Sequence, residues 1–364
     1  MMDKLKLKIL DYYIIRKFLG TFFFSIMLIV TIAVIFDISE KIDDFLEKGA
    51  PLNAIIFDYY LNFIPYFASL FSPLFIFISV IYFTSKMASD TEIIAILSSG
   101  VSFLRLMYPY FIGALLLTVF FFVLNDAIIP HANLVRYEFE DQYLKKKKVT
   151  SRANVHKQVE PGLFVYMQSF NSDNNVGRNF TLERIEDGRL VSKLSADVVR
   201  WDSIRQIWTV SNYRVRNIDG LREQIYTGRR LDTTLNMDPA EFRRRDDFEQ
   251  TMGVLELNRY INHLQMQGAD NINYYRNALH KRVATPFSAF ILTLIGVTLS
   301  SRKVRGGIGL HIAIGIVLSF SYILFLQFSS QFAAKGTLSP LVAAWIPNVL
   351  FFSIGIYLYY KAPK

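Results

Sequence analysis

The order of charged and uncharged segments most constrains the fold of this chain. A helix rises about 1.5 Å per residue and the hydrocarbon core of a bilayer is about 30 Å thick, so about 20 uncharged, apolar residues can cross it. Six segments meet this requirement without any Asp, Glu, Lys or Arg: Phe18–Phe36, Tyr59–Ser85, Leu106–Asn125, Val283–Ser301, Gly306–Ala334 and Gly336–Tyr360. Three lie before the charged stretch 126–282 and three follow it. We therefore predict an α-helical membrane protein with six transmembrane helices and a large domain inserted between helices 3 and 4.

The composition supports a membrane protein that performs no covalent chemistry of its own. Hydrophobic residues make up 52% of the chain, and no cysteine is present, which excludes disulfides and thiolate metal sites. The sequence contains no phosphate-binding loop, no H-E-x-x-H and no G-x-S-x-G, and its five histidines lack the spacing of a metal site. The net charge of +9 comes from Lys and Arg mixed with many acids, so it does not indicate nucleic-acid binding. We expect a non-catalytic protein without metal or cofactor.

Lys and Arg in the short connecting segments predict the orientation, because these residues favour the cytoplasmic side. With the N-terminus inside, only three lie in the outer short segments: Lys41, Lys48 and Lys335. Twelve lie in the inner ones: Lys4, Lys6, Lys8, Arg16, Lys17, Lys86, Arg105, Arg302, Lys303, Arg305, Lys361 and Lys364. Both termini are therefore predicted in the cytoplasm, and the inserted domain outside.

The insert is predicted to contain an all-β domain flanked by helices. Short runs of β-branched and aromatic residues alternate with turn signals, and they are Leu163–Met167, Phe180–Leu182, Leu190–Ser192 and Ile207–Val210. Asp187-Gly188 and Asp219-Gly220 are typical hairpin turns. This pattern favours a β-sandwich or an open roll. The flanking helices are expected at Ala132–Lys147, Leu255–Leu264 and Ile272–Lys281. We place the domain boundaries at 1–131, 132–257 and 258–364.

The inner connection between the second and third segments contains the clearest local pattern. Ser89 and Glu92 have the spacing of a capping box, and Gly100 is a typical helix stop. Between them, Ile93, Ile96 and Leu97 share one face of a predicted helix at 90–99. Such a helix rests on the lipid surface or binds a soluble partner, and in the second case Glu92 pairs with a basic residue there.

All six uncharged segments, in their order, and five motifs carry a resemblance to a known family; the motifs are Asp11–Leu19, Thr91–Ser102, Asn125–Asn133, Arg302–Gly309 and Leu338–Asn348. Together they resemble the LptF/LptG (YjgP/YjgQ) permease family of lipopolysaccharide exporters. It implies one half of an ATP-driven exporter that extracts lipopolysaccharide from the outer leaflet of the bacterial inner membrane. It also implies a second permease chain, an LptB-type ATPase dimer that carries ATP and Mg²⁺, and a periplasmic bridge of LptC- and LptA-type proteins.

The resemblance also implies roles for particular residues. Helix 90–99 becomes the coupling helix, with Glu92 as its ion-pairing acid, Ile93, Ile96 and Leu97 as its docking surface, and Gly100 at its end. The insert becomes a jellyroll-like periplasmic domain that receives the lipid. The first and fifth helices line the lateral entry from the membrane.

Along a path for lipopolysaccharide, aromatic side chains suit the acyl chains, and cations suit the phosphates of the head group. Phe24 and Phe36 are the candidates on the first helix, and Phe320 and Phe325 on the fifth. Lys41 and Arg136 are the candidate cations at the outer rim. Lys41 lies in an acidic segment, 37–47, where relatives of the LptG type tend to have basic residues. Either this chain is the partner subunit, or the substrate head group differs, or these acids face water, which is the simplest interpretation.

Two other classes of membrane protein have weaker sequence support. A secondary transporter needs ionisable groups near the bilayer midplane, and the six segments have none except His311 near an end. A mechanotransmitting subunit of an ABC system has a similar layout, but its large domain generally follows the first helix.

Overall fold

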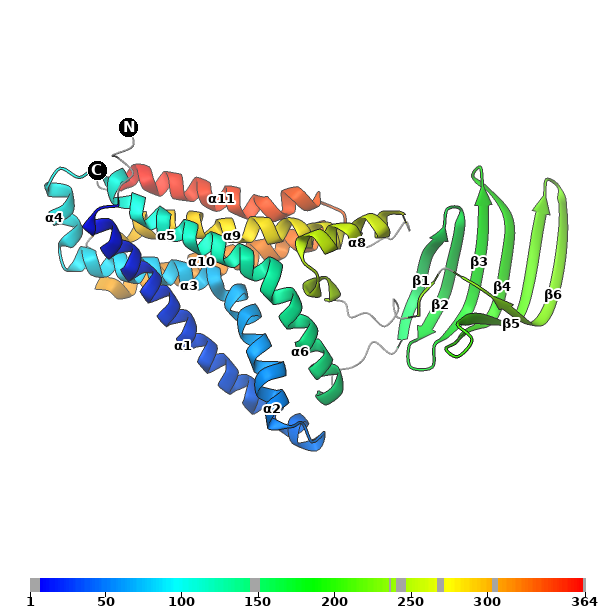
Figure 1. Cartoon of the computed structure of the whole chain (residues 1–364). Helices are drawn as coiled ribbons and strands as arrows, with labels where there is room; N and C mark the ends of the chain where they lie inside the picture. Colours follow the sequence, from blue (N-terminus) through cyan, green and yellow to red (C-terminus); the bar gives the residue numbers. More distant parts are fainter. Residues whose placement is uncertain are drawn as a thin grey trace. The chain divides into compact units, whose positions relative to one another are not determined.

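A computed structural model describes residues 7–144, 151–235, 237–239, 247–266, 272–302 and 307–362 of the chain. It contains two compact units. The first consists of Met1–Lys145, Gln250–Val254 and Asn273–Lys364, and the second of Lys146–Glu249 and Leu255–Ile272. The first unit is helical and the second is built on a β-sheet (Figure 1).

Helices form nearly all of the first unit. In chain order these are α1 (Ile9–Glu47), α2 (Leu52–Ala54), η2 (Ile55–Tyr60), α3 (Leu61–Ser89), α4 (Glu92–Ser98), α5 (Phe103–Val123), η3 (Leu124–Ile128), α6 (Ile129–Tyr143), the short η4 (Phe248–Thr251), α9 (Ile272–Ser300), α10 (Gly307–Ala334) and α11 (Pro340–Lys361). The labels η2 and η3 mark π-helical turns that join α2 to α3 and α5 to α6 without a break.

Six of these helical runs are long and apolar enough to cross a membrane, which confirms the prediction. They are Ile9–Glu47, Leu52–Ser89, Phe103–Tyr143, Ile272–Ser300, Ile308–Ala334 and Pro340–Lys361. Each contains most or all of one predicted uncharged segment; Ser301 follows α9, and residues 336–339 precede α11. The first three exceed the predicted segments considerably. At 1.5 Å per residue, the 39 residues of α1 extend about 58 Å, roughly twice the hydrocarbon thickness.

The helix α3 lies at the centre of the packing. It contacts α1 on one side and α10 on another, and α1 also contacts α5. A small residue brings α9 close to α3, because a Cβ atom added at Gly296 would lie 2.7 Å from Cγ1 of Val80. Small residues allow such close approach between membrane helices, which lack a hydrophobic driving force for association within lipid.

The ends of several helices gather on one side of the unit, which is called its inner side because the charge pattern predicts that it faces the cytoplasm; the opposite side is called outer. Figure 1 shows α4 beside the start of α1 and the ends of α3 and α11. The ring of Phe103, at the start of α5, is 6.1 Å from that of Tyr359, near the end of α11. The first and last helices therefore begin and end on the side where α4 lies.

At the opposite side, α1, η2 and α6 extend past the other helices and meet in a small aromatic core (Figure 1). Phe45, Tyr59, Tyr60, Phe139 and Leu144 are all buried there. The rings of Phe45 and Phe139 are 5.8 Å apart, and both contact Tyr59. Because Phe45, Phe139 and Leu144 lie beyond the uncharged segments, hydropathy alone could not predict this core.

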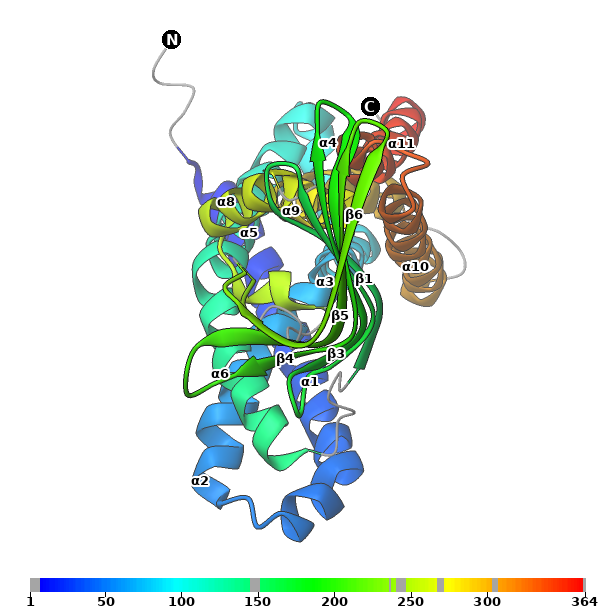
Figure 2. The same ribbon diagram turned by 90° about the vertical axis from the view of Figure 1, so that its right-hand side faces the viewer.

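The second unit contains six antiparallel strands in sequential order, β1 to β6. Their bounds are β1 (Ser151–Glu160), β2 (Leu163–Asn171), β3 (Val176–Glu186), β4 (Arg189–Asp202), β5 (Ile207–Asp219) and β6 (Arg222–Thr233). The sheet is strongly twisted and curved (Figure 2). The unit also contains α8 (Val254–Met266), which matches the helix predicted at Leu255–Leu264.

An all-β domain between the third and fourth membrane helices is thus confirmed. Of the two predicted arrangements, the described strands form the open roll, since all six belong to one sheet and a sandwich needs two. Alternate residues of β2 to β5 bury one face of the sheet, and Trp208 is fully buried there. Its indole nitrogen donates to the backbone oxygen of Met237 at 3.0 Å, which joins the segment after β6 to the core.

The hairpin turns were predicted well, with one shift of register. Asp187 and Gly188 both have positive φ, as a two-residue type I′ turn requires. At the next predicted turn Asp219 remains in the strand and pairs with Arg222, so the loop residues are Gly220 and Leu221. Glycine at the first loop position is typical of a type II′ turn.

One longer turn depends on a carboxylate. Asp202, at the end of β4, accepts hydrogen bonds from the backbone N–H groups of Ile204 and Arg205 at 3.0 and 3.1 Å. These bonds, together with the Arg205 side chain, hold the pKa of Asp202 below its usual value.

The flanking helices fit the predictions in position, and α8 and α9 exceed them in length. The structure places α6 at Ile129–Tyr143, and the last predicted residues of that helix, 145–147, lie outside the described residues. The helix expected at Ile272–Lys281 is the beginning of α9, which continues into the membrane segment without a break.

Candidate functional site

The short helix α4 connects α3 to α5 on the inner side, within the helix predicted at 90–99. Its N-cap is Thr91, which has a left-handed backbone with φ of 63° and no capping bond from its side chain. The predicted capping box is therefore wrong, because Ser89 is still part of α3. The left-handed Thr91 turns the chain between the two helices. Gly100, with φ of 86°, ends the segment as predicted.

The apolar face of α4 packs against its own chain. Ile93 is 1% exposed and belongs to the main core of the helical unit, and Ile96 and Leu97 pack on that core while partly exposed. This differs from the prediction that the three side chains form an outward docking surface. Ile94, which is 55% exposed, is the large apolar side chain on the outer face of α4.

Glu92, at the first position of α4, contacts the inner end of α1. The hydroxyl group of Tyr13 lies 3.2 and 3.1 Å from the two carboxylate oxygens of Glu92 and donates to them. Hydrogen bonds to an ionised acceptor are stronger than those between neutral groups. The acid that sequence patterns singled out is therefore connected to α1 within the same chain.

An ion pair between a buried carboxylate and a partly exposed arginine joins α1 to α5 beside this contact. The two guanidinium nitrogens of Arg105 donate to the two carboxylate oxygens of Asp11 at 2.6 and 2.7 Å. Asp11 is fully buried, and its Oδ2 also accepts from the backbone nitrogen of Lys8 at 2.7 Å. This bidentate geometry is the strong form of an Arg–carboxylate pair. Sequence reasoning missed Tyr13 and the Asp11–Arg105 pair.

At the outer end of α1, Lys41 is not free to face a ligand. Its ammonium group forms an ion pair with Asp37, one turn earlier, and a hydrogen bond with the hydroxyl group of Tyr59. The hydroxyl group of Tyr60 donates to the other oxygen of Asp37 at 3.2 Å. The interpretation that the acids of segment 37–47 face water therefore fails for Asp37, while Glu40 and Asp43 are exposed.

Arg136, the other candidate cation, is also buried. It is 6% exposed, and its guanidinium carbon lies 4.8 Å from the ring centre of Tyr66 and 5.0 Å from that of Tyr137. The Oε1 atom of Glu140, one turn later on α6, lies 3.7 Å from Nε of Arg136. Arg136 thus packs α6 against α3 through cation–π contacts.

The candidate aromatic residues lie on faces that the chain leaves uncovered. Phe24 and Phe36 on α1 and Phe320 on α10 are exposed, and Phe325 is partly buried. In the most apolar 18-residue stretch of each helix, 22% of the residues are buried in α1 and in α10, against 72% in α9. The two helices therefore offer the largest apolar surfaces to a partner or to lipid.

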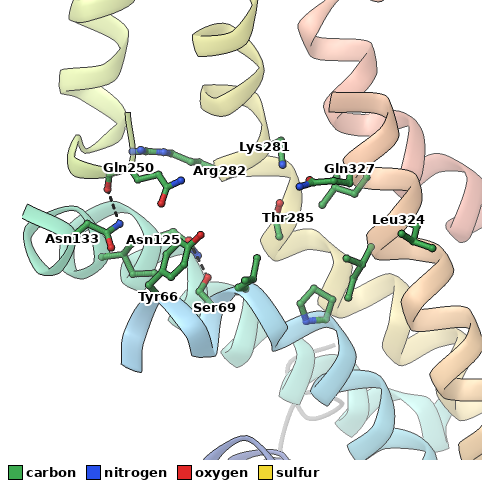
Figure 3. Close-up of a pocket in the computed structure, with 15 residues that line it drawn as sticks. Tyr66, Ser69, Asn125, Asn133, Gln250, Lys281, Arg282, Thr285, Leu324 and Gln327 are labelled. Carbon is green, nitrogen blue, oxygen red and sulfur yellow. Dashed lines mark hydrogen bonds between the residues drawn. The ribbon is translucent and has the colours of Figure 1, made fainter. Parts of the chain in front are cut away.

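A cavity of about 320 Å³ lies within the helical unit, between α3, η3, α6, η4, α9 and α10 (Figure 3). Its polar lining includes Asn125, Asn133, Lys281, Arg282 and Gln327. None of the six substrate-path residues predicted from the sequence lines it. Among the described residues, no cluster of three His, Asp or Glu side chains is arranged to bind a metal ion.

Comparison with known proteins identifies the family. The model of the lipopolysaccharide export system permease LptF/LptG matches residues 12–361, nearly the whole chain. The chain belongs to this family. It is accordingly a non-catalytic transmembrane permease subunit of a lipopolysaccharide export system, with six candidate membrane spans. The resemblance inferred from its motifs is confirmed.

Individual LptG proteins are distant relatives of similar length. The chain is 19% identical to the lipopolysaccharide export system permease protein LptG of Escherichia coli strain K12 over 358 residues, which include 96% of this chain and 97% of the relative. It is 20% identical to the LptG protein of Haemophilus influenzae over 347 residues, which include 94% and 95% of the two chains.

Proposed function

We propose that this LptF/LptG-family subunit forms one half of an ATP-driven machine that extracts lipopolysaccharide from the outer leaflet of the bacterial inner membrane. The observation that carries the proposal is α4, a short inner helix whose acid, Glu92, is bonded to α1 through Tyr13. A permease without its own nucleotide site needs such an element to receive force. The substrate comes from the family to which the chain belongs.

In this proposal α4 is the coupling helix and binds a separate LptB-type ATPase dimer, which carries ATP and Mg²⁺. Glu92 and the exposed Ile94 face the ATPase, while Ile93, Ile96 and Leu97 fix the helix to the permease from behind. Gly100 gives the chain its sharp exit from α4. The chain itself needs no cofactor.

The same contacts explain how force reaches α1. The Tyr13–Glu92 bond lies at the start of α4, and the Asp11–Arg105 pair joins α1 to α5, which begins just after α4. The inner end of α1 is thus attached to both sides of the α4 segment. A displacement of α4 by the ATPase therefore moves α1.

The uncovered apolar faces of α1 and α10 form one side of the lateral entry for the lipid. A second permease chain of the same family forms the other side. Phe24, Phe36, Phe320 and Phe325 would contact acyl chains or the second permease. Lys41 and Arg136 lie near the outer rim, and a phosphate group that binds either one competes with Asp37 or Glu140. Because of these acids, phosphate binds to the rim more weakly than the two cations alone would suggest.

The β-sheet unit fits a receiver of lipid on the periplasmic side, connected to the LptC- and LptA-type bridge. Its two edge strands are β1 and β6. On β6, Ile225 and Tyr226 are exposed. An edge strand with exposed apolar side chains suits the addition of a strand from another β-domain. In this functional division, 1–131 and 258–364 form the membrane part and 132–257 the periplasmic part, with both termini cytoplasmic.

Purification of the full chain from its native membrane in mild detergent tests the proposal, with mass identification of every chain and lipid that accompanies it. We expect an ATPase, a permease-type chain and lipopolysaccharide in the same complex. A stable complex that contains neither an ATPase nor lipopolysaccharide would contradict the proposal.

A further inference from the structure

The cavity of Figure 3 has a lining that matches a small ligand with one polar end. Polar groups from several helices face the same space, where Figure 3 shows Lys281, Thr285 and Gln327 across from Asn133 and Gln250. The described lining residues include the cations Lys281 and Arg282 and no Asp or Glu, so the formal charge of the lining is positive. Such a lining attracts a phosphate group.

One buried group lacks the hydrogen bond that its burial requires. Asn133 is fully buried; its amide nitrogen donates to the backbone oxygen of Gln250 at 3.0 Å, while its Oδ1 has no hydrogen-bond partner among the described residues. Asn125 differs, because its Oδ1 accepts from Ser69 and its nitrogen donates to Phe121. An unpaired buried acceptor costs about 1–3 kcal/mol, so a ligand that donates a hydrogen bond there gains affinity.

Apolar side chains form the other wall of the cavity and its opening. Leu70 and Pro73 of α3 and Ile323 and Leu324 of α10 line it. Leu70 and Leu324 are 53% and 56% exposed, so the cavity opens between α3 and α10 toward the surroundings of the unit. A hydrocarbon chain can leave the cavity by this route without crossing polar groups.

We propose that this cavity binds the head group of one bilayer phospholipid that carries both a phosphate and an N–H or O–H donor. The phosphate binds beside Lys281 and Arg282, the donor bonds to Oδ1 of Asn133, and an acyl chain passes between Leu70 and Leu324. Phosphatidylethanolamine has this chemistry. The site shares α10 with the proposed lipopolysaccharide path and differs from it in size and in its polar lining from α6 and α9.

The volume of the cavity separates this ligand from the exported lipid. Pockets for small molecules measure about 300–1,000 Å³, and 320 Å³ is at the lower end of that range. One head group and the first part of one chain fit such a space. A glycolipid with several acyl chains requires the much larger cavity between two permease chains.

Lipid exchange in the purified complex tests the proposal. The complex is stripped of lipid, incubated with mixed micelles of phosphatidylethanolamine, phosphatidylcholine or diacylglycerol, and analysed by native mass spectrometry. We expect about one retained phosphatidylethanolamine per chain. Phosphatidylcholine, which has the phosphate but no N–H donor in its head group, should be retained several-fold less, and diacylglycerol not at all. Equal retention of the three lipids overturns the proposal.

A variant that fills the cavity provides the second arm. Thr285→Phe places a ring in the cavity and should lower phosphatidylethanolamine retention several-fold. Ser353→Phe, at an exposed position of α11 outside the cavity, is the matched control and should retain the lipid. If Thr285→Phe retains phosphatidylethanolamine and loses lipopolysaccharide instead, the cavity belongs to the export path and the proposal is wrong. Since neither arm measures export, their result does not depend on the proposed function.

Discussion

The two ends of α1 are fixed by different kinds of contact. At the inner end a fully buried carboxylate, Asp11, accepts two hydrogen bonds from Arg105, which is 94 residues away on another helix. At the outer end Lys41 pairs with Asp37 on the same helix and with a buried tyrosine of η2, and the Lys41 and Asp37 side chains keep 20% and 13% exposure. The first arrangement joins distant elements, whereas half of the second lies within α1. The comparison indicates that the inner end, where the proposed function has force enter, is fixed to a distant helix, whereas the outer end is fixed partly within α1 itself.

Removal of the inner cation should have the largest effect on stability. Arg105→Met leaves the Asp11 carboxylate buried without its partner, and breaking a buried pair in this way costs about 3 kcal/mol. The midpoint of thermal unfolding in detergent should fall markedly. The double variant Asp11→Leu/Arg105→Met should recover most of the loss, because apolar replacement of both partners is often nearly neutral. A double variant as unstable as Arg105→Met would show that the unpaired charge is not the cause.

Removal of the outer cation should have a smaller effect. Lys41→Met leaves Asp37 with the hydroxyl group of Tyr60 and with access to water, so we expect a loss of about 1 kcal/mol. Glu40→Gln, at an exposed neighbouring acid, is the control and should change little. If Lys41→Met destabilises the chain as much as Arg105→Met, the two ends are equally firm and the contrast drawn above is incorrect.

The smallest effect on stability should accompany a clear effect on coupling. Tyr13→Phe removes only a partly exposed hydroxyl group, so unfolding should shift by about 0.5 kcal/mol or less. Because the variant disconnects Glu92 from α1, ATP-driven lipid release should fall several-fold while the ATPase remains bound. Tyr12→Phe, at the neighbouring exposed tyrosine, should behave as wild type. Identical release by the two variants would exclude a role for the Tyr13–Glu92 bond.

The sequence predicted the membrane architecture because hydropathy depends on local composition alone. Six uncharged segments became six long helices, and Asp187-Gly188 became a hairpin turn. The outer aromatic core was not predictable in this way, since Phe45 and Phe139 are 94 positions apart in sequence and lie outside the apolar segments. The extension of α1 and α6 beyond the predicted membrane segments depends on packing between such residues.

The sequence predicted the position of α4 but not the packing of its side chains. The pattern around Glu92 located α4, yet periodicity cannot show whether an apolar face packs inward or faces a partner, and Ile93 packs inward. The capping-box pattern failed because Thr91 adopts a left-handed backbone that the spacing does not encode. One signal was available for the inner pair: Asp11 and Arg105 are opposite charges that precede the first and third uncharged segments, on the same predicted side of the membrane.

Export by a reconstituted complex with a charge reversal at Glu92 tests the central claim most directly. The wild-type permease, its partner permease and the ATPase are placed in proteoliposomes, and ATP-dependent release of lipopolysaccharide to the bridge proteins is measured. We predict that Glu92→Arg abolishes release and weakens ATPase binding without a change in the unfolding midpoint, while Asp43→Arg, at an exposed acid of the outer end, releases lipid as wild type does. Release by Glu92→Arg at the wild-type rate, with the ATPase fully bound, would contradict the assignment of α4 as the helix that drives this permease.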